Sequence, residues 1–181
     1  MTSELDTHKK QQYEKWEIKM REREKEGICS EKVVINQIEK RANFDGWDTL
    51  AKNDNPGQTG IDLKLKKKNG NCIIIIEAKG ERVRQINAKG RTQMALGAII
   101  MDMKEGNHDR VYCLAFPNTA NFQKAVAMIP TGVRKRLGLN TIFVDCTTGV
   151  LRVLLPDRND VIDLSSFEEL KFVVAKTSSD T

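Results

Sequence analysis

Four consecutive isoleucines at residues 73–76 constrain the fold of this chain more than any other feature. A continuous β-branched run of this length is typical of a strand buried on both faces. The pair Asn69-Gly70 separates it from a second strand-like segment at residues 60–65. Asn-Gly between two such runs is the strongest short-range signal for a β-hairpin with a type I′ turn. The sequence therefore predicts an antiparallel hairpin within a sheet.

The register of this hairpin decides which side chains share a face. If Asn69 and Gly70 form a two-residue loop, paired residues have numbers that sum to 139, and Asp62 lies opposite Glu77. Opposed residues of an antiparallel pair have Cβ atoms about 4.5–5.5 Å apart on one face. Lys79 returns to that face, because side chains alternate along a strand. A one-residue slip would turn Asp62 to the other face.

Two carboxylates at this spacing repel each other unless a cation lies between them, and hard oxygen ligands suit Mg²⁺. The alternative is a solvated strand end, because Glu-x-Lys also occurs at residues 17–19 and 169–171, in charged, helix-like stretches. Only Glu77 and Lys79 end a continuous apolar run. Acids rarely lie unpaired at the end of a core strand, which favours a functional site.

The order Gly-Ile-Asp, a polar turn and an apolar strand ending in Glu-Ala-Lys resembles the PD-(D/E)xK nuclease superfamily, in particular its Mrr-like and RecB-like branches. Asp62 matches the first acid of that motif, Glu77 the second acid and Lys79 the lysine. Ile61 stands where the family name has proline, a substitution common in these branches. The resemblance implies an α/β fold with a restriction-endonuclease-like core, in which helices flank a central mixed β-sheet in the order αβββαβ.

The same resemblance implies a metal-dependent endonuclease that hydrolyses phosphodiester bonds of DNA. Mg²⁺, or Mn²⁺ in its place, would be held by Asp62, Glu77 and the backbone carbonyl of Ala78, while Lys79 would orient the attacking water. A restriction or host-defence endonuclease is the first expectation. A recombination or repair nuclease, such as a junction resolvase, is the second, and a non-catalytic DNA-binding protein is the third. A homodimer is implied if both strands are cut.

Residues 30–39 predict the first helix of this fold, with Ser30 as its N-cap. Related nucleases often carry a further acid on this helix. Glu31 is the first candidate and Glu39 the reserve, with an ordinary helix-surface carboxylate as the alternative for either. The residues expected on the buried side are Val34, Ile35 and Ile38.

Residues 90–101 predict a helix that follows the catalytic strand. RecB-like nucleases place a positioning glutamine there, and Gln93 matches it, with a solvent-facing polar group as the alternative. Gly97 is expected to allow close packing of the helix against the sheet. The residues expected to fill the core are Met94, Met101 and Met103.

A formal net charge of +5 and a sequence pI near 9.0 suit a polyanionic partner such as DNA. Two basic clusters are expected to flank the predicted metal site, one on the hairpin and one beyond the catalytic strand, with a solubilising surface as the alternative for each. The expected DNA-binding residues are Lys64, Lys66, Lys67, Lys68, Arg82, Arg84, Lys89 and Arg91. Their phosphate contacts would position DNA without reading its sequence. A third cluster at residues 134–136 is interpreted as a solubilising surface, with a further phosphate contact as the alternative.

At 181 residues and 39% hydrophobic content, the chain can bury one sizeable core. We expect a charged N-terminal helix at residues 1–27, one nuclease-like domain at residues 28–175 and a disordered tail at residues 176–181. The N-terminal helix carries one apolar stripe. We expect this stripe to dock on the core or to pair with a second subunit, with a position near DNA as the alternative, because an acid follows almost every base in the segment.

The later part of the chain predicts a strand at residues 110–116, helices at 118–129 and 130–138, and paired strands at 141–145 and 150–155. Residues 165–168 read as a capping box for a last helix.

Scattered cysteines without a Cys-x-x-Cys pair predict reduced thiols in a cytoplasmic protein. With two histidines in the sequence, few ligands are available for a zinc site. The chain has no run of eighteen apolar residues and no phosphate-binding loop motif. We therefore expect neither a membrane partner nor a nucleoside triphosphate.

Overall fold

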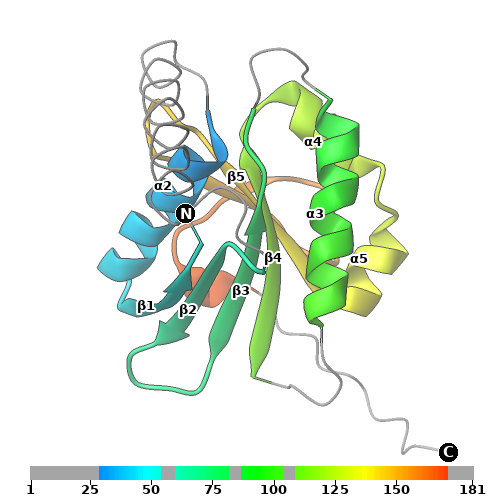
Figure 1. Cartoon of the computed structure of the whole chain (residues 1–181). Helices are drawn as coiled ribbons and strands as arrows, with labels where there is room; N and C mark the ends of the chain where they lie inside the picture. The colour runs from blue at the N-terminus through cyan, green and yellow to red at the C-terminus, as the bar shows by residue number, and fades with distance from the viewer. Residues whose placement is uncertain (1–28, 54–59, 82–86, 104–108, 171–181) are drawn as a thin grey trace, which may run out of the picture.

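The computed structural model describes residues 29–53, 60–81, 87–103 and 109–170, which form one mixed sheet with helices on both faces (Figure 1). The predicted N-terminal helix, the predicted tail, Arg82 and Arg84 lie outside these residues. The strands are β1 (Trp47–Lys52), β2 (Leu63–Lys67), β3 (Ile73–Ala78), β4 (Arg110–Pro117), β5 (Leu139–Val144), β6 (Leu151–Leu154) and β7 (Ile162–Asp163). The helices are α2 (Glu31–Phe44), α3 (Ala88–Asp102), α4 (Ala120–Ala127), α5 (Thr131–Leu137) and the 3-10 helix η1 (Phe167–Glu169).

The seven strands follow one another across the sheet in chain order. Pairing is antiparallel from β1 to β3, parallel from β3 to β5 and antiparallel from β5 to β7. The two parallel connections carry α3 and the α4–α5 pair, which cover one face, while α2 covers the other (Figure 1). The elements from α2 to β4 confirm the predicted α/β class and the order αβββαβ.

The central hairpin has the predicted register, because partners such as Leu63 and Ile76 have numbers that sum to 139. Its turn differs from the prediction. Residues 68–71 form a four-residue loop, and neither Asn69 nor Gly70 has a positive φ, so the expected type I′ turn is wrong. A loop that gains one residue on each side keeps the register of a two-residue loop, and its greater length removes the need for left-handed residues.

Side chains of β3 alternate between two apolar layers. Ile74, Ile76 and Ala78 pack in the layer beneath α2, whereas Ile75 packs in the layer beneath α3 and α4. The period of two along a strand places Glu77 on the α3 face with Ile75. The isoleucine run is therefore buried on both faces, as its composition predicts.

The ends of α2 and α5 follow from their capping residues. Ser30 is the N-cap of α2, as predicted, and its Oγ accepts a hydrogen bond from the backbone nitrogen of Val33 at 3.3 Å. Gly138 ends α5 in the left-handed region at φ 56°. The predicted buried residues of α2 are confirmed as Val34, Ile35 and Ile38.

Other elements of the later chain lie within three residues of their predicted bounds. The predicted last helix is only the short η1, and its capping box joins Ser166 to Glu169, one residue beyond the predicted start. Sequence patterns did not locate β1 or β7. None of the described helices is long and apolar enough to cross a membrane.

Two expectations for α3 are wrong. Met94 and Met101 are exposed, and a Cβ atom on Gly97 would have nothing within 4 Å, so Gly97 does not pack against the sheet. Met103 does pack against the core, as predicted. The helix buries a stripe of small and branched side chains that turns the methionines outward. Its members are Ala88, Thr92, Ala95 and Ile99.

The expectation of reduced thiols is wrong for one pair of cysteines. Cys29 and Cys146 form a disulfide with a Cα–Cα distance of 5.6 Å, although 117 residues separate them in the sequence. Cys72 and Cys113 are free. The fold brings the start of α2 beside the segment after β5, a proximity that cysteine spacing cannot reveal.

Candidate functional site

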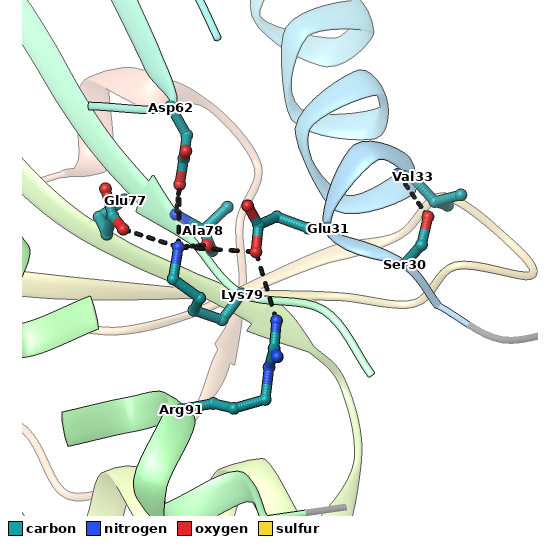
Figure 2. Close-up of polar contacts among 8 residues, drawn as sticks. All are labelled: Ser30, Glu31, Val33, Asp62, Glu77, Ala78, Lys79 and Arg91. Carbon is teal, nitrogen blue, oxygen red and sulfur yellow. Dashed lines mark hydrogen bonds and ion pairs between the residues drawn. The ribbon is translucent and has the colours of Figure 1, made fainter. Parts of the chain in front are cut away.

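The structure brings Asp62, Glu77 and Lys79 together at one point, where the hairpin strands end (Figure 2). Lys79 Nζ donates a hydrogen bond to Glu77 Oε1 at 2.7 Å and lies 3.5 Å from Asp62 Oδ2. It also donates to the backbone carbonyl of Ala78 at 2.7 Å. The hairpin register produces this convergence, because it opposes Asp62 to Glu77 and strand alternation returns Lys79 to their face.

Both carboxylates of the hairpin are buried, which excludes the solvated strand end as an interpretation. Asp62 Oδ2 accepts a hydrogen bond from the backbone nitrogen of Ala78 at 2.7 Å, so its orientation is fixed by β3 itself. Two carboxylates this close together require a positive charge beside them. Lys79 supplies it, and its side chain is only 14% exposed.

Glu31 is the third carboxylate of the cluster (Figure 2). Its Oε2 lies 3.5 Å from Lys79 Nζ and 3.3 Å from Arg91 Nη2. The reserve candidate, Glu39, lies elsewhere on α2 and pairs with Lys52 at 2.6 Å. Of the two acids proposed from the sequence, the structure therefore brings only Glu31 to the site.

Gly80 positions Glu31, and the sequence patterns missed this role. A Cβ atom on Gly80 would overlap the backbone of Ser30 and Glu31 and would lie 2.8 Å from the carbonyl oxygen of Cys29. Only glycine allows two backbones to approach this closely. The exit of β3 therefore packs directly against the start of α2, which sets Glu31 beside Lys79. A glycine directly after the motif lysine was the available signal.

The cluster shifts the protonation of all its acids. Burial is the largest cause and raises the pKa of Glu77 to about 7, with further raising contributions from Asp62 and Glu31. Burial likewise raises the pKa values of Asp62 and Glu31, against the lowering effect of Lys79. Burial alone would lower the pKa of Lys79, but the three surrounding carboxylates raise it. Lys79 is therefore charged at neutral pH, whereas Glu77 is partly protonated.

The donors at this point suit a hard divalent cation. Asp62, Glu77 and the carbonyl of Ala78 offer oxygen ligands of the kind that Mg²⁺ prefers. Glu77 Oε2 is buried and has no hydrogen-bond partner in the described part of the chain, so one oxygen is available to a ligand. Within the described ranges, no three acidic, cysteine or histidine side chains are arranged to hold a metal ion. Lys79 Nζ lies among the three carboxylates instead, and a cation would have to displace it.

Two residues of α3 lie in positions that differ from those expected. Gln93 is exposed and lines a groove toward α4 and α5 with residues such as Met128, so the structure does not bring it to the acid cluster. Arg91, expected at a DNA phosphate, instead pairs with Glu31 and is 13% exposed. Arg91 is thus the α3 side chain that reaches the site.

The hairpin lysines form ion pairs with nearby acids. Lys67 pairs with Glu168 at 2.6 Å, and longer pairs join Lys64 to Asp102 at 3.9 Å and Lys68 to Asp48 at 3.8 Å. Pairs with this much solvent access contribute little to stability, so they can open to meet phosphates. Lys66 and Lys89 are exposed.

The interpretation of the third basic cluster as a solubilising surface is wrong for Arg134. It is buried and donates hydrogen bonds to the carbonyl of Leu155 at 3.0 Å and to Asn159 Oδ1 at 3.1 Å. Lys135 and Arg136 are exposed, as that interpretation requires. The helical period explains the difference, because Arg134 alone of the three lies on the inner face of α5.

Comparisons with known proteins leave the family open. No family model and no curated protein matches this chain. One solved structure, an XisH family protein from Nostoc punctiforme, covers 66% of this chain and 95% of its own, with a TM-score of 0.46 and 18% sequence identity. Similarity at this level assigns neither a family nor an activity to the chain.

Proposed function

We propose that this chain is a metal-dependent endonuclease that hydrolyses phosphodiester bonds of DNA. The observation that carries the proposal is the convergence of Glu31, Asp62 and Glu77 on Lys79 at the end of a buried hairpin. Buried acids with pKa values raised by burial and by like charges are typical of functional sites. The resemblance of this motif to the PD-(D/E)xK nucleases supports the same reaction.

In this proposal Asp62, Glu77 and the carbonyl of Ala78 hold Mg²⁺ or Mn²⁺. The bound cation supplies a Lewis acid for the phosphate and lowers the pKa of a bound water. Lys79, once displaced from the carboxylates, donates hydrogen bonds to the attacking water and to the negative charge that develops on the phosphate oxygens. Asp62 keeps its orientation throughout, because the backbone nitrogen of Ala78 holds it.

DNA is the proposed substrate because β2 and α3, which lead to Asp62 and carry Arg91, also carry exposed basic side chains, among them Lys66 and Lys89. Such residues bind phosphates without regard to sequence. A restriction or host-defence endonuclease is the preferred role, with a recombination or repair nuclease as the alternative. A homodimer is part of the proposal if both strands are cut, and sedimentation of the chain with and without DNA tests it.

The test is cleavage of plasmid, linear and branched DNA with Mg²⁺ or Mn²⁺, comparing the wild type with Asp62→Asn and Lys79→Ala. Each variant is expected to lose activity by at least about a hundredfold, the usual effect of removing a positioned catalytic group. Glu39→Gln, which alters a carboxylate of α2 outside the cluster, is the matched control and should cleave normally. Strong preference for branched DNA would select the repair role. Metal-independent cleavage, or cleavage unchanged in Asp62→Asn, would contradict the proposal.

A further inference from the structure

One carboxylate oxygen joins the two cations of the site. Glu31 Oε2 lies 3.5 Å from Lys79 Nζ and 3.3 Å from Arg91 Nη2 (Figure 2). The side chain of Glu31 is 37% exposed, whereas those of Arg91 and Lys79 are 13% and 14% exposed. The shared oxygen thus belongs to the residue that is most accessible to an incoming ligand.

The partner of Arg91 resembles a phosphate in its chemistry. A guanidinium presents a planar fork of donors, which matches the oxygens of a carboxylate and those of a phosphodiester equally well. Glu31 therefore occupies a position on Arg91 that a DNA phosphate oxygen can take. Its negative charge also repels a phosphate that approaches the cluster.

A divalent cation would alter this arrangement. The three carboxyl groups of the cluster lie close to the cationic side chain of Lys79, and that of Glu31 lies close to Arg91 as well. A cation that enters among the carboxylates offers Glu31 a stronger partner than either side chain. Arg91 then loses Glu31 as a partner, and a phosphate oxygen can take the position that Glu31 Oε2 held on the guanidinium.

We propose that Arg91 positions a DNA phosphate, and that Glu31 holds the Arg91 guanidinium until a divalent cation binds. The inference rests on the proposed nuclease function and deepens it, because it makes cation binding and DNA binding mutually reinforcing. Such coupling is reciprocal, so DNA raises the affinity for the cation by the same factor. Glu31 acts in this scheme as an internal substitute for the phosphate.

The experiment measures the affinity for a short DNA duplex by fluorescence anisotropy, with EDTA or with Ca²⁺, and a gel verifies that the duplex stays intact. In the wild type, Ca²⁺ is expected to strengthen DNA binding by about tenfold, a usual size for coupling between sites. Glu31→Gln should bind DNA about tenfold more tightly than the wild type in EDTA and gain little from Ca²⁺.

Arg91→Ala should lower the slope of log affinity against log salt by about one, the effect of one lost phosphate contact, but only with Ca²⁺ present. Arg91→Lys should restore the slope, because it restores the charge. An Arg91 that only supported the fold would affect binding equally in EDTA and in Ca²⁺. The matched control is the exposed pair Arg152–Asp163 at the sheet edge, whose variants Arg152→Ala and Asp163→Asn should change neither the slope nor the effect of Ca²⁺.

The two proposals fail in different ways. Metal-dependent cleavage by the wild type, together with an equal effect of Ca²⁺ on DNA binding in the wild type and Glu31→Gln, would overturn the role of Glu31 and leave the nuclease intact. A wild type that neither binds nor cleaves DNA would overturn both. Calorimetric titration of Ca²⁺ with and without the duplex provides the reciprocal measurement, and an unchanged cation affinity would also reject the coupling.

Discussion

Gly80 and Glu31 are in backbone contact, so that a Cβ atom on Gly80 would overlap the backbone nitrogen of Glu31. The backbone nitrogen of Glu81 extends the contact with a hydrogen bond of 2.8 Å to the carbonyl oxygen of Cys29. The strand that carries Glu77 and leads to Lys79 is thereby joined to the helix that carries Glu31. This direct backbone contact fixes how the start of α2 lies against the exit of β3.

Gly80→Ala is expected to lower the free energy of unfolding by about 1–3 kcal/mol, because the added methyl group forces the neighbouring backbone to shift. Gly97→Ala is the matched control on the exposed face of α3, where a Cβ atom meets nothing within 4 Å. It should raise the free energy of unfolding by about 0.5–1 kcal/mol, the difference in helix propensity. Urea denaturation measures both, and equal effects of the two substitutions would show that the contact at Gly80 is not tight.

Lys79→Met is expected to lower the free energy of unfolding by about 3–5 kcal/mol, because it leaves buried carboxylates without their cation. Added Mg²⁺ should recover more stability in the variant than in the wild type, since it no longer competes with the ammonium group. Thermal unfolding with EDTA and with Mg²⁺ tests this, with Lys89→Met as the control at an exposed lysine. A variant as stable as the wild type in EDTA would show that Lys79 does not neutralise the acids.

The hairpin and its acids could be predicted because the signals are local. A strand has a period of two, so one register fixes the faces of Asp62, Glu77 and Lys79 at once. The predicted register is correct although the predicted turn type is wrong, because the observed loop is longer than the expected one by one residue on each side. The first turn of α2 was equally readable from its N-cap, Ser30.

The contribution of α3 could not be predicted in the same way. Each residue turns a helix by about 100°, so Gln93 and Arg91 point in nearly opposite directions. Asn87 starts the helix by accepting a hydrogen bond from the backbone nitrogen of Gly90 at 2.9 Å, and how α3 then lies against the sheet depends on packing. The resemblance supplied a glutamine on this helix, but only the assembled fold shows that Arg91 faces the acids.

Arg134→Met is expected to lower the free energy of unfolding by about 1–3 kcal/mol, because it removes the buried hydrogen bonds that the guanidinium donates to the carbonyls of Ile129 and Leu155. Lys135→Met and Arg136→Met alter exposed neighbours on the same helix and should stay within about 0.5 kcal/mol of the wild type. Chemical denaturation of the three variants makes the comparison. A loss of stability at Lys135 as large as that at Arg134 would contradict the structural role given to Arg134.

Glu77 is expected to make the fold less stable as the pH rises through the neutral range. Its pKa is raised from 4.5 to about 7 in the folded state, mainly by burial. Between these two values the folded protein holds a proton that the unfolded chain has released, so the free energy of unfolding falls as the pH increases. The contribution of Glu77 is fully favourable below about pH 4.5 and is lost above about pH 7.

Glu77→Gln removes this titration while it keeps the shape of the side chain. In EDTA, the wild type should therefore lose about 1–3 kcal/mol more stability than the variant between pH 5 and pH 8. This difference in the free energy of unfolding corresponds to a shift of about one to two pKa units. Urea denaturation at the two pH values measures the difference. Mg²⁺ should reduce the loss in the wild type at pH 8, because a bound cation stabilises the ionised carboxylate. Parallel pH profiles of the wild type and the variant in EDTA would mean that Lys79 already compensates the ionised Glu77 in full.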